Sequence, residues 1–363
     1  IRSSMEEYLD SGILTEYASG LQVLRREFDG RPARTGMLMC IDLDAYDYRP
    51  NSTSPIRPTE GTIIDRIPPR KAIRCEATLE LPHILVLIND PQRTIIEPVF
   101  DILAAEEPLY STQLMKNGGK VCAYRSEDSA LIESTTAAFE KLANSKLPDP
   151  RYQSEHPFFI AIGDGNHSLA TAKEVWEDMK AIIPNDQTRD HPARYALVEV
   201  VNIYDEGILF EPIHRLFFDI CADNFLEYLS GERGATIHQV TDLGQALSEA
   251  EANGKWVSAG YVSGNRKGIV EFPGQDPLMT AKVIQEAIDG YPSLEGTSLD
   301  FIHDFETVIN LGAQPGNLGI VMPAISKASF FPYLQENGTY PRKSFALGES
   351  NEKRYYMEAR RIR

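Results

Sequence analysis

The sequence has few cysteines, no long apolar run and fewer basic than acidic residues. Its four cysteines are far apart, and none forms a C-x-x-C pair or a cluster with histidine at zinc spacing. This scatter excludes a disulfide scaffold and predicts reduced thiols in a cytoplasmic protein. No apolar stretch approaches the roughly 20 residues that cross a membrane. The first residues show no signal-peptide pattern and no initiator methionine, so we expect a trimmed or internal piece of a cytoplasmic chain.

The charge balance limits the kinds of partner. Lys plus Arg number 36 and Asp plus Glu number 53, which gives a net charge of -17. A surface this acidic repels phosphate backbones and anionic lipid, so we expect neither a nucleic acid nor a membrane partner. A small anionic substrate would need a local basic pocket. The 363 residues are enough for a sizeable core and about two domains.

Helical and strand patterns alternate along the chain. Strand patterns occupy residues 21–28, 36–43, 83–88 and 158–162, and helical patterns occupy residues 129–143 and 169–183. The alternation predicts an α/β or α+β fold of mixed sheets with flanking helices. We expect an N-terminal α/β part at 1–183 and a C-terminal α+β part at 193–363, with one intertwined unit as the alternative.

The strongest local signal is a glycine loop between an apolar strand and a helix. Its sequence is Gly163-Asp164-Gly165-Asn166-His167. The glycines permit a sharp turn, and helix N-terminal amides favour an anion, so Gly163, Gly165, Asn166 and Ser168 are candidate phosphate-binding residues. Asp164 is a candidate Mg²⁺ ligand and catalytic residue, and His167 a candidate proton donor. The alternative is an ordinary helix cap.

Two further segments carry clustered charge or histidine. Arg57, Arg66 and Arg70 are candidate anion-binding arginines, and Glu60 is a candidate base for a substrate hydroxyl. We predict that Arg57 and Arg66 line the same pocket as His167; the alternative is a solvated charged loop. His214 and Arg215 are candidate substrate-binding residues, although a lone histidine near an apolar run is more often a core residue. A P-loop, a G-x-S-x-G elbow and a G-x-G-x-x-G turn are missing.

A set of short motifs is spread along the chain: Arg57-Pro58-Thr59-Glu60, Ile67-Pro68-Pro69-Arg70, Glu80-Leu81-Pro82-His83, the loop from Gly163 to Ala172, Pro212-Ile213-His214-Arg215, Leu299-Asp300-Phe301-Ile302-His303, Met322-Pro323 and Pro341-Arg342-Lys343-Ser344-Phe345. Through these motifs nearly the whole chain resembles the bacterial family called domain of unknown function 1015. The resemblance implies an absent N-terminal segment. The family's tendency to lie among serine-biosynthesis genes implies a phosphorylated three-carbon acid as substrate.

The Asp164-Gly165-x-His167 element is similar to a motif of the ParB/sulfiredoxin-like group, which includes nucleotide-binding partition proteins and free-serine kinases. There the motif reads Asp-Gly-His-His-Arg, in a loop that holds nucleotide phosphates. In this chain Asn166 replaces the first histidine and Ser168 replaces the arginine. The resemblance implies a ParB-like core and a nucleotide site, provided that Arg57, Arg66 or Arg215 supplies the missing charge.

These observations predict a cytoplasmic enzyme that acts on a phosphorylated small molecule or nucleotide. The expected reaction is phosphoryl transfer or phosphate-ester hydrolysis, as in a small-molecule kinase or phosphatase, because such chemistry needs mainly positioning and charge neutralisation. The expected cofactors are Mg²⁺ and a nucleotide, and a homo-oligomer is compatible with the sequence. The alternative is a non-catalytic nucleotide- or metabolite-binding regulatory protein that uses the same pocket.

Overall fold

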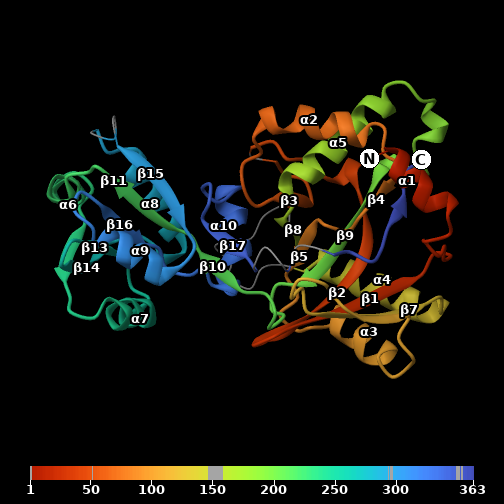
Figure 1. Cartoon of the computed structure of the whole chain (residues 1–363), viewed down its shortest axis with the longest axis horizontal. Coiled ribbons are helices and arrows are strands. Elements are labelled where there is room, and N and C mark those ends of the chain that lie inside the picture. The colour runs from red at the N-terminus through yellow and green to blue at the C-terminus, as the bar shows by residue number, and fades with distance from the viewer. Residues whose placement is uncertain are drawn as a thin grey trace. The chain divides into compact units, whose positions relative to one another are not determined.

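The computed structural model describes residues 2–50, 52–145, 158–292, 294, 297–348, 352 and 355–363. The chain divides into two compact units (Figure 1). The first comprises Ile1–Leu209, Leu334–Thr339 and Leu347–Arg363, and the second comprises Phe210–Tyr333 and Tyr340–Ala346. The first of these stretches therefore ends at Leu209, and the second unit begins at Phe210.

An eight-stranded mixed sheet forms the centre of the first unit. Its strands lie in the order β3 (Ile56–Pro58), β8 (Ile160–Asp164), β5 (Leu85–Ile88), β9 (Tyr195–Asn202), β2 (Arg31–Asp42), β1 (Leu21–Phe28), β7 (Lys120–Ser126) and β6 (Tyr110–Gln113). β3 is parallel to β8 and β5 is parallel to β9, whereas the other neighbours are antiparallel. Because β3 and β8 run the same way, the loops that follow them leave the same edge of the sheet.

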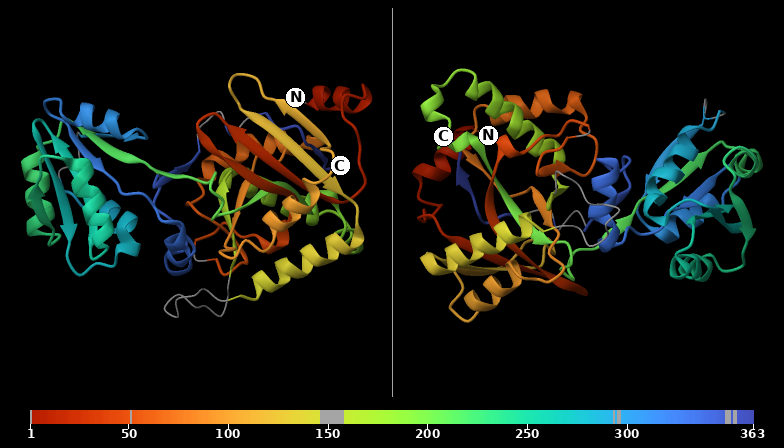
Figure 2. Two further views of the ribbon diagram at one scale, coloured as in Figure 1. Left: turned by 90° about the horizontal axis from the view of Figure 1, so that it is seen from below. Right: turned by 180° about the vertical axis from the view of Figure 1, so that it is seen from behind.

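Helices cover one face of this sheet, as Figure 2 shows for the helix that follows β7. The helices of the unit are α1 (Arg2–Asp10), α2 (Ile67–Arg74), α3 (Ile96–Leu103), α4 (Ser129–Ala143) and α5 (Asn166–Lys180). Val99 of α3, Leu142 of α4 and Trp176 of α5 belong to the same buried cluster as Val86 and Val198 of the strands. This apolar layer is the main core of the unit.

The opposite face of the sheet is covered in part by the last residues of the chain. Leu24 and Ala123 of this face pack with Tyr355. Arg26 donates hydrogen bonds to the carbonyl oxygens of Glu352 (2.7 Å) and Tyr355 (3.1 Å). Farther on, β18 (Arg360–Arg361) pairs with β4 (Leu79–Glu80). The C-terminal residues are thus a structural part of the first unit.

The second unit has a six-stranded sheet with helices on both faces. Its strands lie in the order β12 (Thr236–Gln239), β14 (Arg266–Phe272), β13 (Val257–Ser263), β16 (Leu318–Val321), β11 (His214–Phe218) and β15 (Ser298–Ile302), and every neighbouring pair is antiparallel. The helices are α6 (Ala222–Gly231), α7 (Leu243–Asn253), α8 (Thr280–Asp289), α9 (Phe305–Gly312) and the first part of α10 (Lys327–Asn337), whose residues from Leu334 on belong to the first unit. Phe225 of α6 and Ile284 of α8 share one core cluster, and Leu243 of α7 and Val308 of α9 share the other. A small sheet pairs β10 (Phe210–Pro212) with β17 (Phe345–Leu347).

The predicted fold class is confirmed: mixed sheets with flanking helices build both units. The predicted strands over 21–28 and 36–43 form as the antiparallel pair β1 and β2, although β2 begins at Arg31, directly after the Asp29-Gly30 turn. The predicted strand over 83–88 is shorter, since β5 begins at Leu85. In the described ranges no helix combines the length and the apolarity required to cross a bilayer.

Candidate functional site

The two segments that the sequence singles out lie side by side. The parallel pairing places Arg57 opposite Ala161 and Pro58 opposite Ile162. The segment that follows β3 and the glycine loop that follows β8 therefore leave neighbouring strands in the same direction. Thr59 and Asn166, which are 107 residues apart in sequence, meet directly at this point.

Asn166 fastens the two segments together. Its Oδ1 accepts a hydrogen bond from the Thr59 amide (3.2 Å), and its Nδ2 donates to Thr59 Oγ1 (3.2 Å). Thr59 is fully buried, and its hydroxyl donates to the Ile162 carbonyl (2.6 Å). Both ends of the Asn166 amide are therefore engaged in joining the segments.

His167 makes a second connection of the same kind. Its Nε2 accepts a hydrogen bond from the amide of Ile63 (3.1 Å). A ring nitrogen that accepts is unprotonated, so this bond places the proton of the neutral ring on Nδ1. In this arrangement His167 can donate a proton from Nδ1, while Nε2 holds the segment before the short 3₁₀ turn Ile64–Arg66.

The glycine loop is shaped by packing as well as by its turn. Gly165 has a left-handed φ of 88°, and a Cβ there would lie 3.2 Å from Ile84 Cα. A Cβ on Gly163 would lie 2.7 Å from Leu347 Cδ1. Two loop amides have acceptors within the chain: that of Gly165 bonds Asp164 Oδ1 (2.7 Å) and that of Ser168 bonds the Gly165 carbonyl (2.9 Å). These contacts are those of a capped turn, so phosphate binding at this loop stays a prediction.

The three predicted arginines of the segment differ in their surroundings. Arg57 is only 5% exposed, its Nε donates to the Ser54 carbonyl (2.8 Å), and its guanidinium lies 4.4 Å from the centre of the Phe158 ring. Burial lowers the pKa of Arg57. Arg66 and Arg70 are exposed, and Arg70 donates to the Arg66 carbonyl (2.8 Å). The exposed pair is therefore better placed than Arg57 to meet a ligand from solvent.

Asp164 turns toward the other face of the sheet and lines a narrow cleft there. The residues around the cleft are Arg34, Pro82, His83, Leu85, Asp164, Glu199, Leu347, Glu352 and Tyr356. The space amounts to about 20 Å³, which is room for one water-sized group. Glu60 is half-buried just after β3. Two residues separate Asp164 from His167 in sequence. Asp164 lines this cleft, whereas Nε2 of His167 bonds the Ile63 amide.

A buried ion pair dominates the electrostatics of this cleft. Arg34 Nε and Nη2 donate to the two carboxylate oxygens of Glu199 at 3.1 and 3.3 Å, and both side chains are more than nine-tenths buried. Although burial lowers it, the pKa of Arg34 is raised overall because Glu199 and Glu352 stabilise the charged form. Arg34 Nη1 lies 4.0 Å from Glu352 Oε2, and Arg31 binds Glu352 at 2.8 Å.

Tyr356 closes the cleft with a protonated hydroxyl. Burial first, and the negative charge of Glu199 second, raise the pKa of Tyr356 to about 12. Its ring lies beneath the guanidinium of Arg26, with 5.3 Å between the guanidinium carbon and the ring centre. At neutral pH the cleft therefore offers carboxylates, one guanidinium and one hydroxyl donor within a small space.

His214 and Arg215 belong to the second unit, on β11. His214 is 2% exposed and its Nδ1 accepts from the Met322 amide (3.1 Å). Burial, and then Arg215, lower its pKa to about 4. Arg215 is fully buried and donates to Gln285 Oε1 (3.0 Å) and to the Lys343 carbonyl (2.8 Å). These contacts are those of core residues, and ligand binding by this pair stays a prediction.

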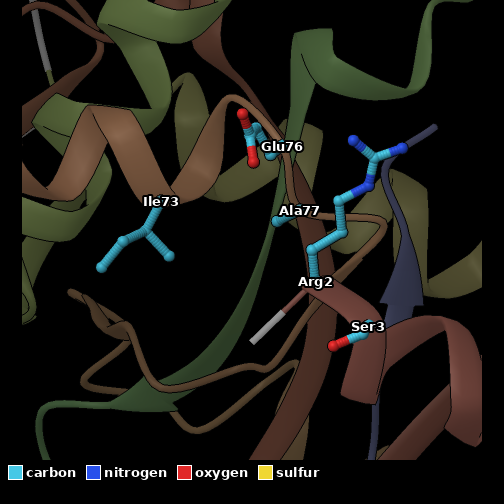
Figure 3. A pocket seen from close by; sticks show the side chains of 5 residues that line it. All are labelled: Arg2, Ser3, Ile73, Glu76 and Ala77. Carbon is cyan, nitrogen blue, oxygen red and sulfur yellow. The ribbon is translucent and has the colours of Figure 1, made fainter.

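A separate hollow of about 350 Å³ lies at the start of the chain. Its lining residues are Arg2, Ser3, Ile73, Glu76 and Ala77 (Figure 3). Arg2 pairs with Glu6 (3.0 Å), and Ile73 is 51% exposed. None of the predicted site residues lines this hollow. Its lining residues belong to the start of α1, to the end of α2 and to the residues that follow α2.

The cleft contains charged residues that the sequence motifs did not single out. Glu199 interrupts the apolar run of β9, and a carboxylate in a buried strand is a usable signal for a paired charge. Gly36 is a second signal, because a Cβ there would lie 2.7 Å from Glu199 Oε1. Glu352 and Tyr356 follow no pattern that would have placed them beside Asp164.

The described ranges contain no preformed metal site. No group of three or more histidine, cysteine or carboxylate side chains there is arranged to hold one. Of the carboxylates around the cleft, Glu199 is engaged with Arg34 and Glu352 with Arg31. Asp164 fits the kind of Mg²⁺ site in which one carboxylate acts together with substrate phosphates and water.

Comparisons with known proteins agree with the sequence-based resemblance at the level of the family. The family described as a protein of unknown function, DUF1015, matches residues 1–276. A search of curated proteins finds no match.

Solved structures show only distant likenesses. A free serine kinase in complex with AMP has 12% identity and a TM-score of 0.41, over 89% of this chain and 91% of its own. A conserved hypothetical protein from Pyrococcus furiosus has 11% identity and a TM-score of 0.41, over 86% and 91%. SbnI from Staphylococcus aureus, with a C-terminal truncation, has 11% identity and a TM-score of 0.41, over 86% and 83%. At this distance the likeness carries no conclusion about this chain.

Proposed function

This chain belongs to the DUF1015 family of proteins of unknown function, and from its site geometry we propose that it binds a phosphorylated small molecule or nucleotide. The proposed reaction is phosphoryl transfer or phosphate-ester hydrolysis. The observation that carries the proposal is the junction at the end of β8. There a left-handed glycine opens a 15-residue helix, Asp164 precedes it, and a segment with two exposed arginines is fastened beside it.

Three features of the junction support phosphoryl transfer as the proposed reaction. The N-terminal end of α5 carries the positive end of the helix dipole. Arg66 and Arg70 lie three and seven residues after Ile63, whose amide bonds His167, and we propose that their positive charge adds to that of the helix end. We propose that Asp164 holds Mg²⁺ together with the substrate phosphates, since the ion would neutralise charge on the transferred group.

The proton-transfer groups are proposed from the same geometry. His167 would donate from Nδ1, because Nε2 is the acceptor of the Ile63 amide. Glu60 is the proposed base for a substrate hydroxyl, and it directly follows Thr59 at the joined segments. We keep Gly163, Gly165, Asn166 and Ser168 as the proposed phosphate-binding residues.

Finer hypotheses follow from the motif. We propose that Asp164, Gly165 and His167 form a ParB-like nucleotide-phosphate loop in which Arg66 or Arg70 replaces the missing arginine. A link to serine metabolism, a cytoplasmic location and a homo-oligomeric state are parts of the same proposal.

A non-catalytic binding protein is the second candidate, and a specific observation favours it. Both polar ends of the Asn166 amide are engaged in joining the two segments, as is Nε2 of His167. The cleft beside Asp164 holds only about 20 Å³. A site with so little space and so many engaged polar groups is as suitable for ligand sensing as for catalysis.

The first experiment measures binding. Calorimetric titration with ATP, ADP and inorganic phosphate, each with and without Mg²⁺, is performed on the unmodified protein and on the double variant Arg66→Ala/Arg70→Ala. Arg189→Ala, at an exposed arginine nine residues beyond the end of α5, is the control for a lost surface charge. We expect at least tenfold weaker binding in the double variant and unchanged binding in the control. Equal binding in all three proteins would remove the arginines from the site.

The second experiment separates catalysis from sensing. Once a ligand is found, phosphorus NMR follows its turnover in Asp164→Asn, His167→Ala and Glu60→Gln. We expect losses of about 10²-fold or more if these groups act in the transition state. A sensor would bind the ligand without any turnover. A merely capping residue would lower the melting temperature and leave turnover unchanged.

A further inference from the structure

The buried carboxyl group of Asp90 joins α3 to the sheet, away from the proposed site. β5 ends at Ile88, and the chain turns through Asp90 into α3. Asp90 Oδ2 accepts hydrogen bonds from the amides of Thr94 (2.6 Å) and Ile95 (3.2 Å). Asp90 therefore caps the turn that leads into the helix, and it is 2% exposed.

Glu97, in the first turn of α3, reaches back to the end of β9. Its Oε1 accepts a hydrogen bond from Asn202 Nδ2 (2.9 Å). The same Nδ2 also donates to the Asp90 carbonyl (2.8 Å), and Asn202 is 1% exposed. One amide thus connects the carboxyl ends of the parallel strands β5 and β9 with α3.

The second oxygen of Glu97 is buried without a hydrogen-bond partner. Within the ranges that the structure describes, Glu97 Oε2 has no polar atom in bonding distance. Burying a carboxylate oxygen without a donor costs far more than burying a neutral carboxyl group. Burial raises the pKa of Glu97, the Asp90 carboxylate raises it further, and the Asn202 bond and the Arg93 guanidinium oppose them. Asp90 and Arg93 are the charged groups that face Glu97 from the turn before α3, and Asn202 is the polar group that faces it from β9.

We propose that Glu97 keeps its proton in the folded protein at a pH where exposed glutamates are ionised, and that losing this proton loosens the joint between α3 and the ends of β5 and β9. The direction of the pH dependence follows from the linkage between protonation and folding. A group whose folded pKa is raised gives its full stabilisation below the ordinary pKa, and that stabilisation is lost as the pH rises through the folded pKa. The joint should therefore be tighter in mildly acidic than in alkaline solution. The proposed protonation of Glu97 does not depend on the proposed function.

The direct test is a carbon-13 NMR titration of the glutamate side-chain carboxyl groups in the unmodified full chain. Glu106, exposed just beyond α3, is the internal comparison. We expect the Glu97 resonance to titrate at a clearly higher pH than that of Glu106. A titration at the same pH as Glu106, or below it, would overturn the proposal.

Hydrogen exchange tests the consequence for the joint. Protection factors of the α3 amides, corrected for intrinsic exchange, are compared across pH 5 to 9 in the unmodified protein, in Glu97→Gln and in the control Glu106→Gln. We expect protection to fall with rising pH in the unmodified protein and in the control, and to stay level in Glu97→Gln, which mimics the neutral form. If Glu97→Gln shows the same fall, Glu97 does not control the joint. The titration needs no variant, so the proposal can still fail if Glu97→Gln does not fold.

Discussion

Replacing Glu199 by glutamine leaves the guanidinium of Arg34 buried without its carboxylate partner. Both side chains are more than nine-tenths buried, and the present contacts are 3.1 and 3.3 Å. Removing one partner of a buried ion pair typically costs about 3–5 kcal/mol. Glutamine can still accept one hydrogen bond, and Glu352 lies 4.0 Å from Arg34 Nη1. We therefore expect the first unit to lose about 2–4 kcal/mol of unfolding free energy.

The double variant Arg34→Met/Glu199→Gln separates the charge effect from a packing effect. Once both charges are gone, no ion is left buried alone, so we expect a loss smaller than that of Glu199→Gln alone. Asp47→Asn is the control, because it removes an ion pair in which Arg49 is 79% exposed. Exposed pairs contribute little, so we expect almost no change there.

The assay is equilibrium urea unfolding followed by tryptophan fluorescence. The chain has two tryptophans, and Trp176 is buried in the first unit. All variants are therefore made in a Trp256→Phe background, so that the signal reports on the first unit alone. If Glu199→Gln costs no more than Asp47→Asn, or if the double variant costs the sum of the single changes, the ion pair is not the stabilising element described here.

Three further outcomes are expected. Gly36→Ala should destabilise the first unit by about 1–3 kcal/mol, because the new methyl group meets the buried carboxylate of Glu199. The control Gly61→Ala, whose new methyl group has no atom within 4 Å, should leave the stability unchanged, and urea unfolding compares the two variants. Gly165→Ala should lower the melting temperature, because alanine is strained at a φ of 88°, and an unchanged value would contradict this. The second unit should lose stability as the pH falls from about 6.5 to about 4, since the unfolded chain protonates His214 first; Trp256 fluorescence reports it, and His214→Gln should abolish this dependence.

Local patterns were enough to predict the junction at the end of β8. An apolar run followed by Gly163-Asp164-Gly165 fixes a strand, a turn and a helix start within one short segment. The same kind of reasoning makes Arg57 a candidate anion-binding residue from its charge and its neighbours, but a local pattern does not give the direction of the side chain. In the folded chain Arg57 lies in β3 with its guanidinium against Phe158, and only the pairing of β3 with β8 decides this.

The charged cleft was harder to predict because it depends on long-range pairing. Arg34 faces Glu199 only because β2 and β9 are neighbours in one register. Glu352 and Tyr356 reach the cleft from a segment without regular structure in the described ranges, so neither a strand nor a helix period marks them. The carboxylate inside the apolar run of β9 was the clearest clue in the sequence.

The covering of the open sheet face by C-terminal residues affects the order of events during synthesis. Arg26 binds carbonyl groups that lie 326 and 329 residues later in the chain. When Asp164 and Glu199 have left the ribosome, the residues that close their cleft have not yet been made. The cleft of the nascent first unit therefore stays incomplete, with Arg34 and Glu199 beside an uncovered sheet face, until Tyr356 has left the ribosome. A stalled or prematurely terminated chain would hold most of the sheet and a cleft without its far wall.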